Sequence, residues 1–187
     1  MSEKKELSIV ALSSSESQPG NYVLILEDME AQRRIPIIIG LAEAQSIAVA
    51  MEQMQPVRPL THDLLKSVVA ALDGTLKEVV IHTLSEGVFY AHIVLQKHDG
   101  TLFEIDARTS DAIALAIRCS APVYSFERVI LDAGILADTL AGHQMGGSMA
   151  KYSLQELEEL LQKVIAKEDY ESASKIRDYI ERRKEEG

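Results

Sequence analysis

Two short segments of this sequence contain residue types that could carry out chemistry on a phosphate group. Asp106 and Asp111 are separated by five positions and have Arg108 between them, and His62 is followed directly by Asp63. Carboxylates bind hard divalent cations, a guanidinium matches phosphate oxygens, and an imidazole transfers protons near neutral pH. Together they could hydrolyse a phosphodiester with the help of Mg²⁺ or Mn²⁺ held by Asp106, Asp111 and Asp63.

Each of these residues also has an ordinary structural interpretation. Asp63 and Asp111 lie where a helix is expected to begin, and there a carboxylate caps amides and complements the helix dipole. Arg108 and Asp106 could form an ion pair that holds the helix entrance, and His62 could be a surface residue. Arg58, between two prolines, could contact a substrate phosphate or hydrogen-bond to loop carbonyls.

The elements that must position these residues follow from the hydrophobic pattern. Strands are predicted over 7–12, 22–26 and 34–39, with a turn at 18–21 between the first two, and a helix is predicted over 41–54. A second helix begins at Thr61, whose hydroxyl is expected to cap it, and its apolar stripe is Leu64, Leu65, Val68 and Leu72. Gly74 ends this helix.

A three-stranded meander is predicted next, over 78–84, 88–96 and 101–107. Ser110 and Asp111 then open a short, almost wholly apolar helix over 112–117, and 123–126 forms a last strand. These elements predict an α+β domain over 1–136, with a mixed or antiparallel sheet and helices packed on it. His62 and Asp111 can act together only if this fold brings their two segments into contact.

The last part of the chain reads as a separate helical hairpin over 152–187, joined by a flexible, glycine-containing linker over 137–151. Ser153 and Glu156 form a capping box, and apolar residues then recur at helical spacing. So small a unit buries little surface alone, and we expect it to pack on a copy of itself or on a partner.

Composition restricts the classes of function. The chain of 187 residues has a net charge of -10, which opposes nucleic-acid binding by bulk charge. Cys119 is the only cysteine, so a disulfide within the chain is excluded and a reducing cytoplasm is favoured. No signal peptide or membrane span is expected, and the absence of glycine-rich nucleotide-binding motifs predicts no organic cofactor.

Four blocks of the sequence resemble the bifunctional nuclease family over about residues 7–136. The two longest are Arg58-Pro59-Leu60-Thr61-His62-Asp63-Leu64 and the run from Asp106 to Ala116. The others are 35–40 with Glu43-Ala44, and Phe89-Tyr90-Ala91. Thr109 departs from the family pattern, which typically has proline there. The resemblance implies a nuclease acting on DNA or RNA.

The run from Ala166 to Asp178 is similar to the UVR motif of nucleotide-excision repair proteins, a helical hairpin of which two copies associate. Tyr170 and Ser174 replace a commoner phenylalanine and alanine. The resemblance implies contact with a protein partner, through residues that we expect to be Leu157, Leu161, Tyr170, Ile176 and Arg177.

Two classes of function remain open on the sequence alone. One is a metal-assisted nuclease that contacts a partner through its hairpin. The other is a non-enzymatic adaptor or regulator that recruits a protein, or binds a small molecule or metal without turnover. In both cases exposed apolar helices predict a homo-oligomer such as a dimer.

Overall fold

The computed structural model describes residues 3–15, 18–28, 30–31 and 33–136, together with positions 154, 157–158, 161–162, 176–177 and 180 in the C-terminal part. The chain divides into two units, Met1–Ala137 and Asp138–Gly187. No helix in the described part is both long and apolar enough to cross a membrane.

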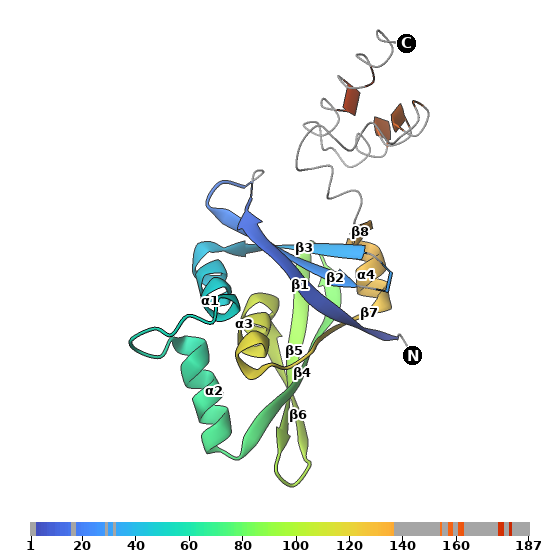
Figure 1. Cartoon of the computed structure of the whole chain (residues 1–187). Coiled ribbons are helices and arrows are strands. Elements are labelled where there is room, and N and C mark those ends of the chain that lie inside the picture. The colour runs from blue at the N-terminus through green and yellow to red at the C-terminus, as the bar shows by residue number, and fades with distance from the viewer. Residues whose placement is uncertain are drawn as a thin grey trace. The chain divides into compact units, whose positions relative to one another are not determined.

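The first unit contains an eight-stranded sheet in the order β6-β5-β4-β7-β1-β2-β3-β8 (Figure 1). All neighbouring strands run antiparallel except β4 and β7, which are parallel, so the sheet is mixed. The predicted α+β class, with a mixed or antiparallel sheet and packed helices, is therefore confirmed. The strands are β1 (Lys4–Ser14), β2 (Asn21–Asp28), β3 (Arg33–Gly40), β4 (Gly74–Ser85), β5 (Val88–Lys97), β6 (Leu102–Arg108), β7 (Val123–Phe126) and β8 (Ile135–Leu136).

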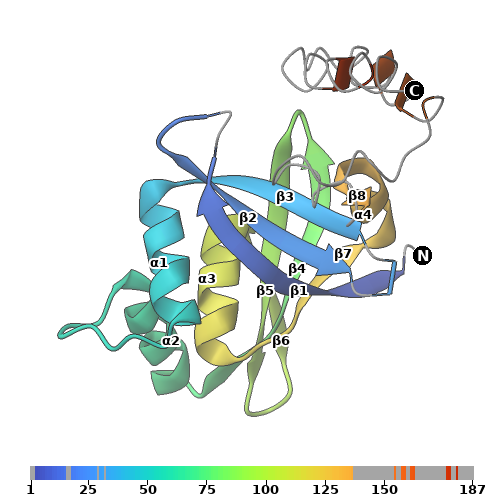
Figure 2. The same cartoon turned by 45° about the horizontal axis from the view of Figure 1, so that its top comes forward.

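Three helices cover one side of these strands, and a fourth lies near β7 and β8. They are α1 (Leu41–Met51), α2 (Thr61–Ala71), α3 (Thr109–Cys119) and α4 (Glu127–Ala133). Figure 2 shows α1 and α3 side by side across the sheet, and α2 beside their ends. The sequence pattern located the first three helices but missed α4 and the two-residue strand β8.

Helix α3 is the most enclosed element of the domain. Its residues 112–116 are all buried, and α1, α2 and β4 to β6 surround it. The three alanines in this run are small, so neighbouring backbones can approach closely, while Ile113 and Leu115 fill the remaining space. Ser120 ends the helix in a left-handed conformation, with φ of 52°.

The start of α2 differs from the prediction. Thr61 does not cap the helix, because it is already the first helical residue and the cap position is Leu60. The carboxylate of Asp63 instead accepts a hydrogen bond from the backbone N–H of Leu60, at 2.8 Å. Asp63 therefore performs the reciprocal half of a capping box, which needs no hydroxyl at the cap.

We predict that Ile113→Ala lowers the free energy of unfolding by about 2–5 kcal/mol, because Ile113 is fully buried and the change leaves a cavity. Urea unfolding followed by circular dichroism measures this. Leu131→Ala, on α4, is the matched control: Leu131 is 55% exposed, so its loss should change little. Equal effects of the two substitutions would contradict the packing described for α3.

Candidate functional site

A hydrogen-bonded chain joins α1, α2 and α3 at the point where the three helices meet. His62, in the first turn of α2, has its Nδ1 2.8 Å from the hydroxyl of Ser46 on α1. Its Nε2 lies 3.2 Å from Oδ1 of Asp111, in the first turn of α3. A neutral imidazole with its proton on Nε2 satisfies both contacts, since Nε2 then donates to Asp111 and Nδ1 accepts from Ser46. The predicted meeting of the two segments therefore occurs.

Arg108 extends this chain toward solvent. Its Nε donates to Oδ2 of Asp111 at 2.8 Å, and its Nη1 donates to Glu43 on α1 at 2.9 Å. The hydrogen bond to Asp111, above all, raises the pKa of the Arg108 guanidinium, so it stays charged. The side chain is 67% exposed, and a phosphate could reach it without displacing the fold. We call Glu43, Ser46, His62, Arg108 and Asp111 the junction cluster.

Two strand-to-helix connections without intervening residues position the junction cluster. Strand β3 ends at Gly40 and α1 begins at Leu41, while β6 ends at Arg108 and α3 begins at Thr109. The hydroxyl of Thr109 donates to the carbonyl of Phe89 at 3.0 Å, which ties the start of α3 to β5. At Gly40 a Cβ would lie 2.6 Å from Oε2 of Glu43, so glycine leaves room for the carboxylate that binds Arg108.

A second ion pair attaches α2 to α3. Arg118 donates from Nε to Oδ1 of Asp63 at 2.6 Å and from Nη1 to the carbonyl of Ala114 at 2.9 Å. Its side chain is only 6% exposed, and its Nη2 has no protein partner among the described residues. The hydrogen bond from Arg118, followed by that from the Leu60 amide, lowers the pKa of Asp63. Asp63 is therefore a structural anchor of α2 in this fold.

The predicted site residues are thus only partly brought together. Asp106 pairs with His92 across β5 and β6, is exposed, and takes no part in the junction cluster. The alternative of an Arg108–Asp106 ion pair is not observed, because Arg108 binds Asp111 and Glu43 instead. Arg58 is exposed in the loop before α2 and forms no ion pair with the other described residues.

The same geometry bears on the predicted metal. Asp63 and Asp111 are each held by a different arginine, and Asp106 lies outside their network. In the part of the chain that the structure describes, no three His, Cys, Asp or Glu side chains are grouped to share an ion. These carboxylates therefore do not fit a metal site in this arrangement, and Mg²⁺ or Mn²⁺ stays a prediction.

Sequence reasoning missed Ser46 and Arg118, and it named Glu43 only as part of a block of family resemblance. Ser46 follows Glu43 by three positions, so both lie on the same face of α1. That spacing was a usable signal, but nothing local to α1 shows that this face meets α2 and α3. Cys119 is half-buried, and burial raises the pKa of its thiol, which argues against a thiolate nucleophile.

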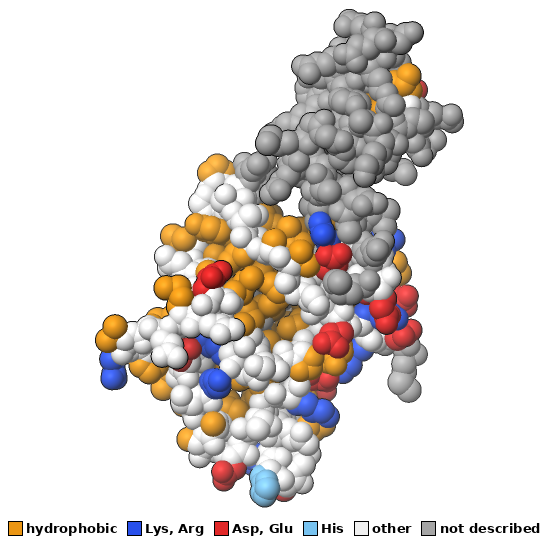
Figure 3. Space-filling model, viewed as in Figure 1, with side chains coloured by type: hydrophobic (Ala, Val, Ile, Leu, Met, Phe, Trp, Pro, Cys, Tyr) orange, Lys and Arg blue, Asp and Glu red, His pale blue; other side chains and the backbone are white. Residues whose placement is uncertain are grey.

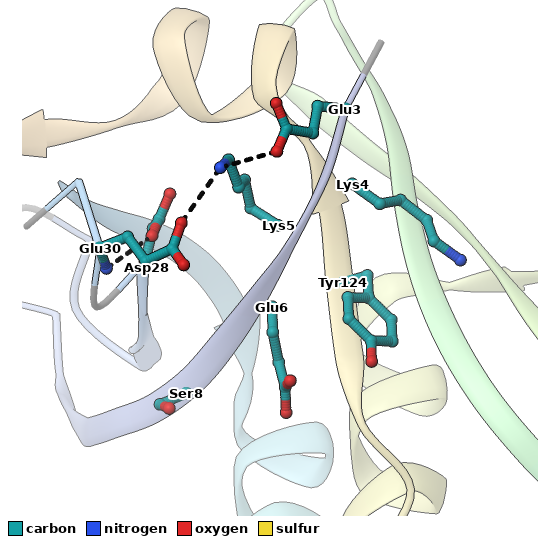
Figure 4. Close-up of a pocket in the computed structure, with 8 residues that line it drawn as sticks. All are labelled: Glu3, Lys4, Lys5, Glu6, Ser8, Asp28, Glu30 and Tyr124. Carbon is teal, nitrogen blue, oxygen red and sulfur yellow. Dashed lines mark hydrogen bonds and ion pairs between the residues drawn. The ribbon is translucent and has the colours of Figure 1, made fainter. Parts of the chain in front are cut away.

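A shallow pocket of about 450 Å³ lies elsewhere, along β1 and the start of β7. Figure 4 shows Lys5 there between Glu3 and Glu30, and its Nζ lies 3.0 Å from the carboxylate of Glu3 and 3.1 Å from that of Glu30. Hydrogen bonds to these two carboxylates raise the pKa of Lys5, so it is a paired surface cation. The pocket shares no residue with the junction cluster and presents no comparable hydrogen-bonded chain.

In the C-terminal unit, Leu157 and Ile176 are buried together with Ile180, and Leu161 packs against them. These predicted partner residues therefore form the interior of the unit in a single chain. Arg177 is exposed. Tyr170 and the predicted linker over 137–151 fall outside the described residues.

Comparison with known proteins agrees with the fold and the motifs. Residues 24–138 match the bifunctional nuclease domain, and residues 151–186 match the UvrB/uvrC motif. An uncharacterized protein of Mycobacterium tuberculosis is 36% identical over 148 residues, which is 79% of this chain and 88% of that protein. The chain belongs to the bifunctional nuclease domain family, and it carries a UvrB/uvrC motif after that domain.

Two plant relatives are more distant. Bifunctional nuclease 1 of rice (Oryza sativa subsp. japonica) is 20% identical over 122 residues, which is 64% of this chain and 37% of that protein. Bifunctional nuclease 2 of Arabidopsis thaliana is 27% identical over 112 residues, which is 55% of this chain and 34% of that protein. Both similarities therefore cover only about a third of the plant proteins.

The Asp63–Arg118 pair predicts a pH-dependent stability. At pH 7, Asp63→Asn should lower the free energy of unfolding by about 1–3 kcal/mol, because it leaves the buried Arg118 without its counter-charge. Since the pKa of Asp63 is lowered in the fold, its contribution is fully present above the ordinary carboxyl pKa of about 4. It is lost as the pH falls further, through the lowered pKa.

Urea unfolding of both proteins from about pH 7 down to about pH 2.5 tests this, and the stability difference should shrink below about pH 4. Asp132→Asn, at an exposed position of α4, is the matched control and should show no such trend. A difference that stays constant to the lowest pH would contradict the assigned role of Asp63.

Proposed function

We propose that the N-terminal domain hydrolyses phosphodiester bonds of DNA or RNA at the junction cluster. The observation that carries the proposal is the position of His62, held between Ser46 and Asp111 beside an exposed arginine. Membership in the bifunctional nuclease domain family and the names of the plant relatives support the same chemistry.

In this mechanism His62 moves the proton. Its Nδ1 accepts the proton of the Ser46 hydroxyl, which in turn takes a proton from the attacking water. The water oxygen forms a new bond to phosphorus, and the bond to the leaving oxygen breaks. A solvent water gives a proton to the leaving oxygen, and the imidazolium releases its own proton to solvent, which restores the neutral ring. Asp111 orients the ring and stabilises its charged form. The Ser46 hydroxyl, 2.8 Å from Nδ1, is the group through which the proton of the water reaches the ring.

Arg108 supplies the positive charge that the overall composition lacks. The net charge of -10 gives a nucleic acid no general attraction to this chain. A guanidinium that is 67% exposed can exchange one carboxylate for a phosphate and keep the other. Binding is therefore expected to be weak, local and dependent on this one side chain.

We predict that His62→Ala lowers the cleavage rate by about 10²–10⁴-fold, because the proton acceptor is lost. Asp111→Asn should also lower the rate, since it removes the charge that stabilises the imidazolium, and Arg108→Ala should mainly raise KM. Labelled single- and double-stranded DNA and RNA, each with Mg²⁺, Mn²⁺ or chelator, are the substrates. Circular dichroism establishes that each variant is folded.

His98→Ala and Asp132→Asn, both at exposed positions, are the matched controls and should cleave as the native chain does. Cleavage that survives all three cluster substitutions would assign the activity to a contaminant or to another site. If no substrate is cleaved under any condition, the enzyme proposal fails and the non-enzymatic adaptor replaces it.

We also propose that the C-terminal unit contacts a protein that carries a similar hairpin. The UvrB/uvrC match over 151–186 supports this role, and so does an exposed Arg177 next to the buried Ile176. Because Leu157, Ile176 and Ile180 already pack together, the contact is expected to use exposed polar residues such as Arg177.

For this role we predict that Arg177→Glu, in the whole chain, reduces recovery of a partner from cell extract, because it reverses the charge of an exposed side chain. Quantitative pull-down measures the recovery. Arg128→Glu on α4 makes the same charge change outside the hairpin and should leave recovery intact. Equal recovery with the native chain and with Arg177→Glu would count against a contact at Arg177.

A further inference from the structure

Helix α2 presents its apolar side to solvent and its polar side to the protein. Leu64, Leu65, Val68 and Leu72 form one helical stripe and are 59%, 41%, 44% and 71% exposed. None of the helix's own residues is buried. A surface helix of a monomeric protein normally faces the other way.

Polar contacts hold α2 in this orientation. His62 bonds to α1 and α3, Asp63 binds Arg118, and Lys66 donates to the carbonyl of Arg118. These three residues lie on the side of the helix that faces the domain. Because these contacts turn the leucine stripe outward, the stripe stays exposed.

The apolar surface continues across the loop that precedes α2 to the last residue of α1. Val57 is 100% exposed and Met54 is 63% exposed, and Met51 and Leu60 are each 37% exposed. Figure 3 shows hydrophobic side chains along this flank of the domain, which lies at the left of the view. We call the stripe and these four residues the α2 face. Its eight side chains expose on the order of 800 Å², which is about the area that each partner contributes to a standard interface.

We propose that the α2 face is the surface on which a second copy of this chain docks, in a two-fold arrangement. In such an arrangement the same patch meets itself, so it must carry no unbalanced charge. Residues 51–72, which contain the face, carry two acidic and two basic side chains that balance to zero, whereas the chain as a whole has a net charge of -10. The face is thus where two acidic copies can approach with the least repulsion.

Two other occupants fit this surface less well. A nucleic acid would need an excess of cations, but Arg58 and Lys66 within residues 51–72 are offset by Glu52 and Asp63. The C-terminal unit of the same chain has already packed Leu157, Ile176 and Ile180 against each other, so its apolar residues do not require the α2 face. The docking proposal does not depend on catalysis. A docked second copy would nevertheless stabilise α2, the helix that carries His62.

Light scattering after size-exclusion chromatography of the full chain, over a range of concentrations, tests the proposal. The native chain should reach about twice its monomer mass of 20.6 kDa. Leu64→Glu/Val68→Glu should remain monomeric, because a two-fold interface would bring four new carboxylates together. The milder Leu64→Ser/Val68→Ser should raise the dissociation constant at least about tenfold, since it removes apolar burial alone.

Leu131→Glu is the matched control, because it places the same charge on a leucine that is 55% exposed on α4, and it should dimerise normally. Circular dichroism of dilute samples establishes that all variants are folded. A native chain that is monomeric at every concentration would overturn the proposal. So would a dimer that persists in both α2 variants, or one that is lost equally in Leu131→Glu.

Discussion

The junction depends on polar contacts that hold α2 against α3. Arg118 is almost fully buried and is neutralised by Asp63, and His62 reaches Asp111 from the next position of the same helix. Breaking such a contact leaves a buried charge unpaired, which costs far more than an exposed pair contributes. Together with the hydrogen bond from Lys66 to the Arg118 carbonyl, these contacts hold α2 and the imidazole of His62 in place.

This attachment has an unusual consequence for the hydrophobic effect. A helix that docks by its polar side must leave its apolar stripe outside, and here that stripe is uncharged and continuous with an exposed loop. Local sequence and single-chain fold therefore disagree at α2, and such disagreements are expected where a protein has a function to perform. The same helix carries the central residue of the junction cluster and the proposed docking surface.

In the junction cluster, the carboxylate of Asp111 has two roles at once. Asp111 receives hydrogen bonds from His62 and Arg108 and lies at a helix start, where the backbone dipole favours its negative charge. Asp111 can therefore stabilise the start of α3 and also belong to a chemical site. Asp63 differs, because the structure uses both of its oxygens for the Leu60 amide and Arg118.

The sequence by itself determined seven of the eight strands, three of the helices and the presence of two units, because alternation and helical spacing are local properties. It also indicated His62, Arg108 and Asp111 as residues that could act together. It could not show that Asp106 lies outside the cluster or that Ser46 and Arg118 complete the contacts, since these depend on which faces of distant elements meet. Most of all, the stripe on α2 predicted an amphipathic helix, but only the tertiary structure decided which side faces the core. The polar pairs with α3 settle that orientation, and the residues that form them are 49 and 55 positions apart in the chain.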